Sequence, residues 1–243
     1  MEKTSRIVRG RTELYVPNSA SSTGEVCYVS PAIQESYRNV GAQILKSGDI
    51  VPVGDLTAPL VHEIYCGDSK DEPEFVAGKG ILQNRFLYVY NKNLHAFEGL
   101  FSVKDRNAEG LSKMLTVNEL KQRLVGGKTS QGVEFSSDGE VAFAPRGSYA
   151  FGEMEDAGKL ALDGAVIAQY GVEGAKLLAE ASANLRNKPK TYGVDVKEGQ
   201  KPVQTVSALY VRDGRLLVIG IYWIDYSVGG CAFPVSAPRA QKN

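Results

Sequence analysis

The sequence is poor in the residues that most often carry chemistry. It has two histidines, three cysteines and one tryptophan among 243 residues. Two histidines leave little room for a Ser-His-Asp triad, and no Gly-x-Ser-x-Gly motif occurs. Cys27, Cys66 and Cys231 are odd in number and widely spaced, which is typical of free thiols in a reducing compartment. We therefore expect a cytoplasmic protein without a disulfide framework.

Charge of one sign and long apolar runs are also lacking. Lys plus Arg and Asp plus Glu number 28 each, which disfavours the strongly basic surface that nucleic-acid-binding domains usually carry. The longest strongly apolar run, 216–224, is far shorter than the roughly 20 residues of a membrane-spanning helix. The first residues lack the apolar centre of a secretory signal. We expect no membrane segment and no signal peptide.

The first half of the chain has the patterns of an α+β protein. Ser30-Pro31 is typical of a helix start, and Gly48 is typical of a helix end. The patterns predict, in order, strands at 12–17 and 25–29, a helix from 31 to 47, a strand at 50–53, a helix at 57–66, and strands at 85–91 and 94–103 joined by a turn at 91–93.

The second half begins after a short helix, for which Thr116 and Glu119 form a capping box. Similar patterns then follow in a similar order. They predict strands at 131–136 and 140–144, a helix at 153–162, a strand at 165–170, a helix at 171–185, and strands at 191–196, 203–211, 215–224 and 230–235.

The two halves also match in their residues. Residues 21–26 and 136–141 agree at all but one position, and Gly54 and Gly171 each open a helix after an apolar segment. Matches that recur in the same order along both halves predict an internal duplication. We predict a tandem ββαβαββ unit, with mostly antiparallel sheets and helices on one face, packed about a pseudo-two-fold axis. The repeats would be 1–110 and 111–243, the second with an extra C-terminal strand, and together they would form one compact unit.

The most specific chemical motif is on the predicted helix 57–66. His62 and Cys66 are four residues apart and so share one helix face, with Glu63 in the position of a general base. This is the spacing of the zinc-protease helix, with cysteine in place of its second histidine. The structural alternative is that Cys66 packs as a small apolar residue and His62 lies at the helix edge. We favour that alternative, and we expect no metal and no cofactor.

A second candidate is the glycine at the start of a helix in each half. Backbone amides at a helix N-terminus can hold phosphate. Neither junction completes a phosphate-binding motif, and the acidic residues Asp55 and Glu173 beside the amides disfavour an anion. We interpret Gly54 and Gly171 as residues of tight turns and close helix packing.

Aromatic residues form the remaining candidate surface. Tyrosines at alternate positions of a strand can build a stacking platform for rings or bases, although they more often pack across strands. We also expect Arg146 to lie near the pseudo-axis. The possible binding surface therefore comprises Tyr88, Tyr90, Tyr210, Tyr222, Trp223 and Arg146.

Three functions remain open. The first is a binding or assembly protein that engages a small molecule or a protein at the cleft between the repeats or at the aromatic face. The second is a hydrolase-like small-molecule enzyme whose carboxylates, tyrosines and arginines meet between the repeats. The third is a binder of single-stranded nucleic acid. The balanced charge makes nucleic acid the least favoured partner.

Overall fold

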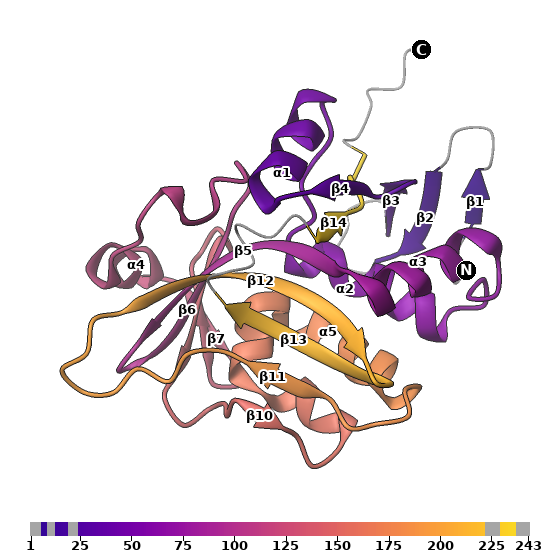
Figure 1. The fold of residues 1–243 in the computed structure, drawn as a ribbon. Helices are drawn as coiled ribbons and strands as arrows, with labels where there is room; N and C mark the ends of the chain where they lie inside the picture. Colours follow the sequence, from indigo (N-terminus) through magenta and orange to yellow (C-terminus); the bar gives the residue numbers. More distant parts are fainter. Residues whose placement is uncertain (1–5, 9–12, 19–23, 222–228, 237–243) are drawn as a thin grey trace.

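The computed structural model of the protein describes residues 6–8, 13–18, 24–221 and 229–236 (Figure 1). Its helices are α1 (Tyr37–Lys46), α2 (Gly54–Cys66), α3 (Pro73–Asn84), α4 (Val117–Leu124) and α5 (Gly164–Ala183). Its strands are β1 (Arg6–Val8), β2 (Glu13–Pro17), β3 (Glu25–Val29), β4 (Ile33–Glu35), β5 (Phe86–Ala96), β6 (Gly99–Lys104), β7 (Lys128–Ser130), β8 (Val133–Phe135), β9 (Val141–Pro145), β10 (Gly152–Glu153), β11 (Lys190–Tyr192), β12 (Val203–Arg212), β13 (Arg215–Ile221) and β14 (Gly230–Ala232). The predicted α+β class is confirmed.

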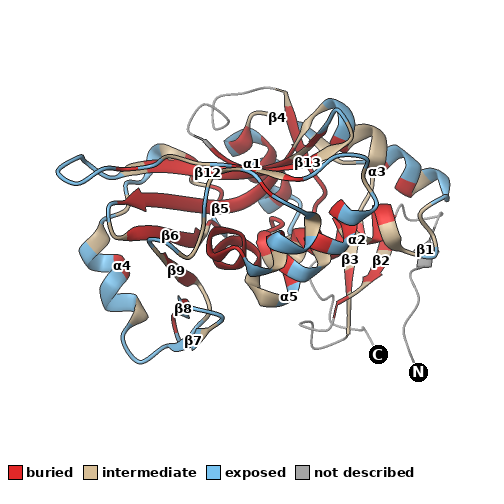
Figure 2. Cartoon of the chain, turned by 90° about the horizontal axis from the view of Figure 1, so that it is seen from below, coloured by how far each residue is buried: buried red, intermediate tan, exposed pale blue. Residues whose placement is uncertain are grey.

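One large sheet runs through both halves of the chain. Its strand order is β10-β11-β13-β12-β5-β6-β9-β8-β7, with β14 and β4 joined beside β5, and most neighbouring strands are antiparallel. β5 and β12 pair at its centre, so the first and second halves share one sheet. β1, β2 and β3 form a separate small sheet. Figure 2 shows that the large sheet curls around α5.

Helices cover both faces of this sheet, so the prediction of helices on one face is wrong. Successive residues of a strand point to opposite faces. Leu87 and Val89 belong to the core that contains α2, α3 and α5, whereas Tyr88 and Tyr90 pack in a second core with α1. Within the described residues, no helix is long and apolar enough to cross a bilayer.

Local signals in the sequence are confirmed where the local chain decides the conformation. The backbone amide of Glu119 donates to the Thr116 hydroxyl at the start of α4. Gly48 has φ +80°, the left-handed conformation expected just after α1. The predicted hairpin around 137–139 forms between β8 and β9.

Three local predictions are wrong, and a fourth is wrong in part, since the helix predicted at 153–162 is a 3₁₀ helix at Ala157–Leu162 preceded by β10. The turn predicted at 91–93 lies inside β5, and the hairpin turns at 97–98 instead. The segment 165–170 is helical rather than extended, because it forms the first part of α5 and is buried on all sides. The helix expected from 31 begins only at Tyr37, after the short strand β4.

The proposed duplication is not established by this fold. The strand predicted in the middle of each unit is absent from both halves: 50–53 forms only a single bridge, from Ile50, and 165–170 is helix. α2 and the second part of α5 nevertheless lie side by side and run parallel, since Ala58 lies next to Gly174 and His62 contacts Glu180.

A break divides α5 into two segments at Gly171. This residue has φ +74° and ψ 167° inside an otherwise helical stretch. Glycine is essentially the only residue that adopts this region, and it does so at the cost of the helical hydrogen bonds on either side. The second segment therefore begins at Val172 with backbone amides that have no acceptor within it.

Replacing Gly171 with alanine tests this break. A Cβ there would meet no atom within 4 Å, so the cost is backbone strain of about 1–3 kcal/mol in the free energy of unfolding. Gly80→Ala is the matched control, because Gly80 lies within α3 and a Cβ there also meets no atom within 4 Å. There alanine should raise the free energy of unfolding, by at most about 1 kcal/mol. Urea unfolding measures both. Equal effects of the two substitutions would show that α5 is not broken at this residue.

Candidate binding site

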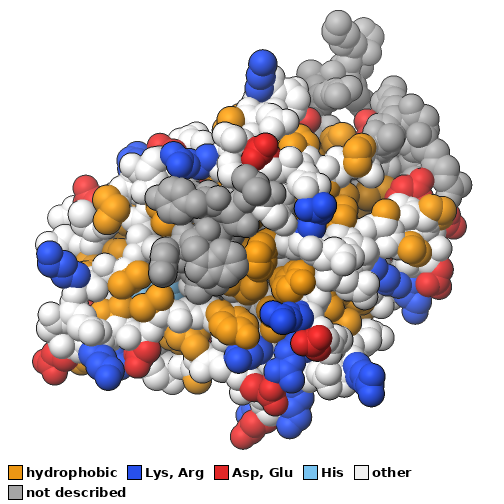
Figure 3. Space-filling view, viewed as in Figure 1, with side chains coloured by type: hydrophobic (Ala, Val, Ile, Leu, Met, Phe, Trp, Pro, Cys, Tyr) orange, Lys and Arg blue, Asp and Glu red, His pale blue; other side chains and the backbone are white. Residues whose placement is uncertain are grey.

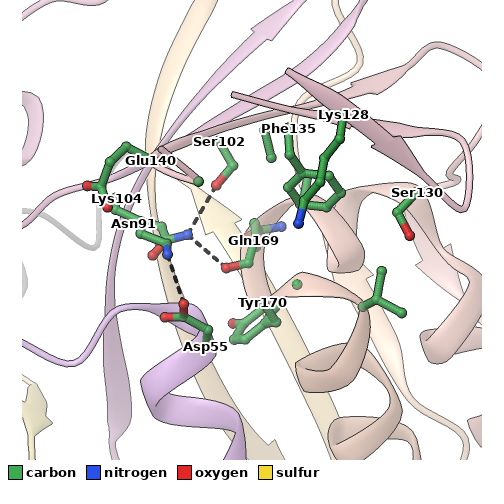
Figure 4. Close-up of a pocket in the computed structure, with 15 residues that line it drawn as sticks. Asp55, Asn91, Ser102, Lys104, Lys128, Ser130, Phe135, Glu140, Gln169 and Tyr170 are labelled. Atoms are coloured by element: carbon green, nitrogen blue, oxygen red, sulfur yellow. Dashed lines mark hydrogen bonds and ion pairs between the residues drawn. The ribbon is translucent and has the colours of Figure 1, made fainter. Parts of the chain in front are cut away.

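A pocket of about 370 Å³ lies beside the break in α5 (Figure 4). Four parts of the fold contribute to its wall: the first turn of α2, strands β5 and β6, strands β7 to β9, and residues 168–172 of α5. The lining includes Asp55, Asn91, Ser102, Lys104, Lys128, Ser130, Phe135, Glu140, Ala142, Gln169, Gly171 and Val172.

Asn91 joins the elements that form the floor of the pocket. Its Oδ1 accepts from the backbone amide of Gly54 at 3.0 Å, and its Nδ2 donates to the backbone carbonyl of Gln169 at 2.8 Å. The same Nδ2 donates to the Ser102 hydroxyl at 3.2 Å. The break leaves the last carbonyls before Gly171 without helical donors, so Asn91 satisfies one carbonyl and one amide that would otherwise be buried without partners.

The polar floor continues inward beneath α5. Gln169 Oε1 accepts from Ser207 at 2.7 Å and from Asn93 at 3.4 Å, and Asn93 also donates to Ser207 at 2.8 Å. Asn93 and Ser207 are fully buried. This side-chain network fixes the rotamer of Gln169 before any ligand arrives.

His95 lies further along the same face of β5. Its Nδ1 accepts from the amide of Val194 at 3.4 Å and its Nε2 bonds to Thr205 at 3.0 Å. Burial lowers the pKa of His95 to about 4, because the interior disfavours the charged imidazolium. At neutral pH it is an uncharged residue of the core rather than part of the pocket wall.

The charged residues at the pocket differ in their pairing. Lys104 pairs with Asp55 at 2.8 Å, and Arg106 holds Glu140 through three hydrogen bonds. Lys128 on β7 has no ion pair or hydrogen-bonded side-chain partner among the described residues. Its ammonium is the uncompensated charge of the pocket wall.

Gly171 lines this pocket, and Gly54 lies behind its wall, against the lining residues Asn91 and Gln169. Gly54 packs so closely on α5 that a Cβ there would lie 1.8 Å from the carbonyl oxygen of Gln169. The interpretation of Gly54 as a close-packing residue and of Gly171 as a turn residue agrees with this geometry. The sequence did not indicate that the two junctions meet.

The His62 motif lies elsewhere, on the outer side of the α2–α5 pair. His62 Nε2 bonds to Glu180 at 2.8 Å, and Cys66 Sγ accepts from Asn184 at 3.2 Å. Burial raises the pKa of Cys66, and the Glu180 carboxylate raises it further, which weakens it as a nucleophile or metal ligand. Glu63 is buried, and the described residues contain no group of three or more His, Cys, Asp or Glu able to hold a metal ion.

The predicted aromatic surface is not formed by Tyr88 and Tyr90. Both are fully buried and pack against Tyr37, so neither ring presents a face to a ligand. Tyr210 is half-buried beside Phe86. The other two members of that set, Tyr222 and Trp223, lie outside the described residues.

Arg146 is a cross-link between chain segments. Its guanidinium donates to the carbonyls of Phe97 and Val196 and to the Asp195 carboxylate, and it lies 4.8 Å from the centre of the Phe97 ring. These contacts hold residues 195–196 against the β5–β6 turn. Figure 3 shows Lys and Arg interspersed with Asp and Glu over one face of the molecule, without a broad basic area.

The sequence singles out Asp55 and Gly171 of the lining but not the amides of the polar floor. Its patterns place Asn91 and Asn93 in a turn and Gln169 in a strand. One signal could have found them. Two asparagines stand among apolar residues of one segment, and if that segment is a single central strand, their amides are buried and must have hydrogen-bond partners.

Asn91→Ala tests the role of the Asn91 amide. The substitution leaves the Gly54 amide and the Gln169 carbonyl buried without partners. Each costs about 1–3 kcal/mol, so the free energy of unfolding should fall by about 2–6 kcal/mol. Asn107→Ala, at an exposed position, should change stability by no more than about 0.5 kcal/mol. Chemical denaturation compares them. A loss below 1 kcal/mol at Asn91 would contradict the assigned hydrogen bonds.

His95 should make the protein less stable in acid. Its folded-state pKa of about 4 lies below the ordinary value of 6.5, so the unfolded chain binds the proton more tightly. Stability from this residue is present at neutral pH and is lost as pH falls through this window, by about 3 kcal/mol in total.

The measurement is the unfolding free energy of the protein and of its His95→Gln variant at pH 7, 5.5 and 4.5. Burial raises the pKa of Asp163 to about 6, so acidification stabilises the fold through this residue. Asp163 is present in both proteins, so its contribution cancels when their unfolding free energies are subtracted. The variant should lose less stability on acidification. Parallel pH curves would exclude a buried neutral His95.

The chain was compared with protein-family models, curated proteins and solved structures, and none matched. The function proposed below therefore rests on the chemistry of the pocket.

Proposed function

We propose that the protein is a non-catalytic binding protein that holds a small molecule in the pocket beside Gly171. The observation that supports this most strongly is the convergence of parts far apart in the sequence, from Asp55 on α2 to Val172 on α5, on one preformed cavity. A ligand-sized cavity with a few fixed polar groups is the usual form of a small-molecule site.

The wall of the pocket suits a small ligand with an apolar part. Phe135, Ala142 and Val172 offer apolar surface, while Gln169, Ser130 and Lys128 offer polar groups. The volume of about 370 Å³ is at the lower end of the range for small-molecule sites, roughly 300–1,000 Å³. A compact molecule fits better than a polymer.

Binding is favoured over catalysis by the way the reactive groups are held. The carboxylates of Asp55 and Glu140 are each paired with a cation, and Ser102 is occupied by Asn91. The described lining contains no cysteine or histidine. A hydrolase-like enzyme remains the alternative, and it would require Asp55 or Glu140 to leave its partner.

The predicted duplication adds a proposal about the position of the pocket. If 1–110 and 111–243 derive from one duplicated unit, the pocket lies where α2 and the second segment of α5 begin, close to the cleft expected between the repeats. The parallel packing of those helices supports this. A cytoplasmic location, expected from the free cysteines, belongs to the same proposal.

A fragment screen by NMR tests the function. Small polar and aromatic fragments should shift the backbone amide signals of residues that line the pocket, such as Gly139, Gly171 and Val172. Ser130→Phe should abolish these shifts, because Ser130 lines the pocket. Thr129→Phe is the matched control, since Thr129 is its exposed neighbour on β7 and lies outside the lining.

The proposal fails if no fragment shifts these amides. It also fails if Ser130→Phe and Thr129→Phe have the same effect, because the bound fragments would then lie outside the pocket.

A further inference from the structure

We propose that the ligand carries an oxyanion, a carboxylate or a phosphate, which binds between Lys128 and Gln169 at the break in α5. This inference rests on the proposed function and names the chemical class of its ligand. It follows from donors that have no acceptor in the described structure.

Gln169 supplies the first donor. Its side chain is 7 % exposed, and its orientation is fixed because Oε1 accepts from Ser207 and Asn93 while Nε2 donates to the Ala165 carbonyl at 2.9 Å. A primary amide nitrogen carries two hydrogens. The second has no acceptor among the described residues, and Gln169 lines the pocket. An unpaired N–H at a nearly buried position is costly, so a ligand acceptor would be stabilised there.

Lys128 supplies the second donor and a full positive charge. Figure 4 shows its side chain extending from β7 over the pocket toward Gln169. Lys104, the other cation of the lining, pairs with Asp55, and the lining carboxylate Glu140 pairs with Arg106. An anion in the pocket would therefore meet the uncompensated charge of Lys128.

The break at Gly171 adds a third contribution. The first amides of the second segment, at Val172 and Glu173, have no acceptor within that segment, and Val172 lines the pocket. The acidic side chains that disfavoured an anion in the sequence are compensated, because Asp55 pairs with Lys104 and Glu173 with Lys176. These ion pairs weaken that objection to an anion, while Asp55 Oδ1 has no hydrogen-bond partner among the described residues.

The rest of the ligand must match an apolar wall. Phe135, Ala142 and Val172 contribute apolar surface to the lining of the pocket. A small aromatic or aliphatic acid, or the corresponding phosphate monoester, combines the required anion with an apolar body of the right size.

Two anionic probes and one neutral probe, all with a phenyl ring, test the charge requirement. Benzoate, benzamide and phenyl phosphate are titrated at low ionic strength and pH 7.5, with the amide signals of Gly171 and Val172 as the readout. Benzoate or phenyl phosphate should bind at least tenfold more tightly than benzamide, and the stronger of the two identifies the carboxylate or the phosphate as the preferred group.

Lys128→Gln should reduce this preference to less than threefold, and added salt should weaken anion binding in the unmodified protein. Lys188→Gln is the matched control, because Lys188 is exposed and does not line the pocket. It should leave the preference unchanged.

Equal binding of benzamide and benzoate overturns the oxyanion but leaves a pocket that binds small molecules. A preference that survives Lys128→Gln overturns the assigned site. If none of the three probes shifts the pocket amides, the oxyanion proposal is also overturned, and the fragment screen separately decides the proposed function.

Discussion

The hydrogen bonds of the Asn91 side chain hold the start of α2 to the break in α5. One carboxamide accepts from the first residue of α2 and donates to the last turn before the break in α5. Because Asn91 belongs to the central strand β5, it fixes both helices to the middle of the sheet. The position of the pocket, of its two glycines and of its polar floor depends on this arrangement.

A polar floor in the core is a costly way to pack a helix on a sheet. Buried amides and hydroxyls stabilise the fold only when their hydrogen bonds are complete, and hydrocarbon side chains of the same shape often serve as well. The floor beneath α5 nevertheless contains Asn91, Asn93, Ser207 and Gln169, all buried. We infer that this network maintains a fixed set of donors at the pocket, which reduces the reorganisation that ligand binding would require.

The sequence predicts those parts of the fold that short segments decide. The capping box at Thr116, the left-handed residue Gly48 and the turn at 137–139 all depend on neighbours within a few positions. The apolar segment 165–170 was interpreted as a strand because a short helix buried on all sides has no polar face to reveal its period.

The site itself could not be predicted in this way. Asn91 contacts residues 37 and 78 positions away, and no local pattern specifies such partners. Lys128 gains its importance only because the ion pairs of Lys104 and Arg106 leave it as the uncompensated cation of the wall. The sequence did single out Gly54 and Gly171, but their meeting at one pocket is a property of the tertiary structure.

Hydrogen exchange of individual backbone amides tests the account most directly. In a continuous helix the amides of Val172 and Glu173 would bond to carbonyls one turn earlier and exchange as slowly as the middle of the second segment. The break at Gly171 predicts fast exchange at these two amides, together with slow exchange at Gly54, whose amide donates to Asn91. Uniform slow exchange from 165 to 181 would contradict the break, and with it the donors on which the pocket depends.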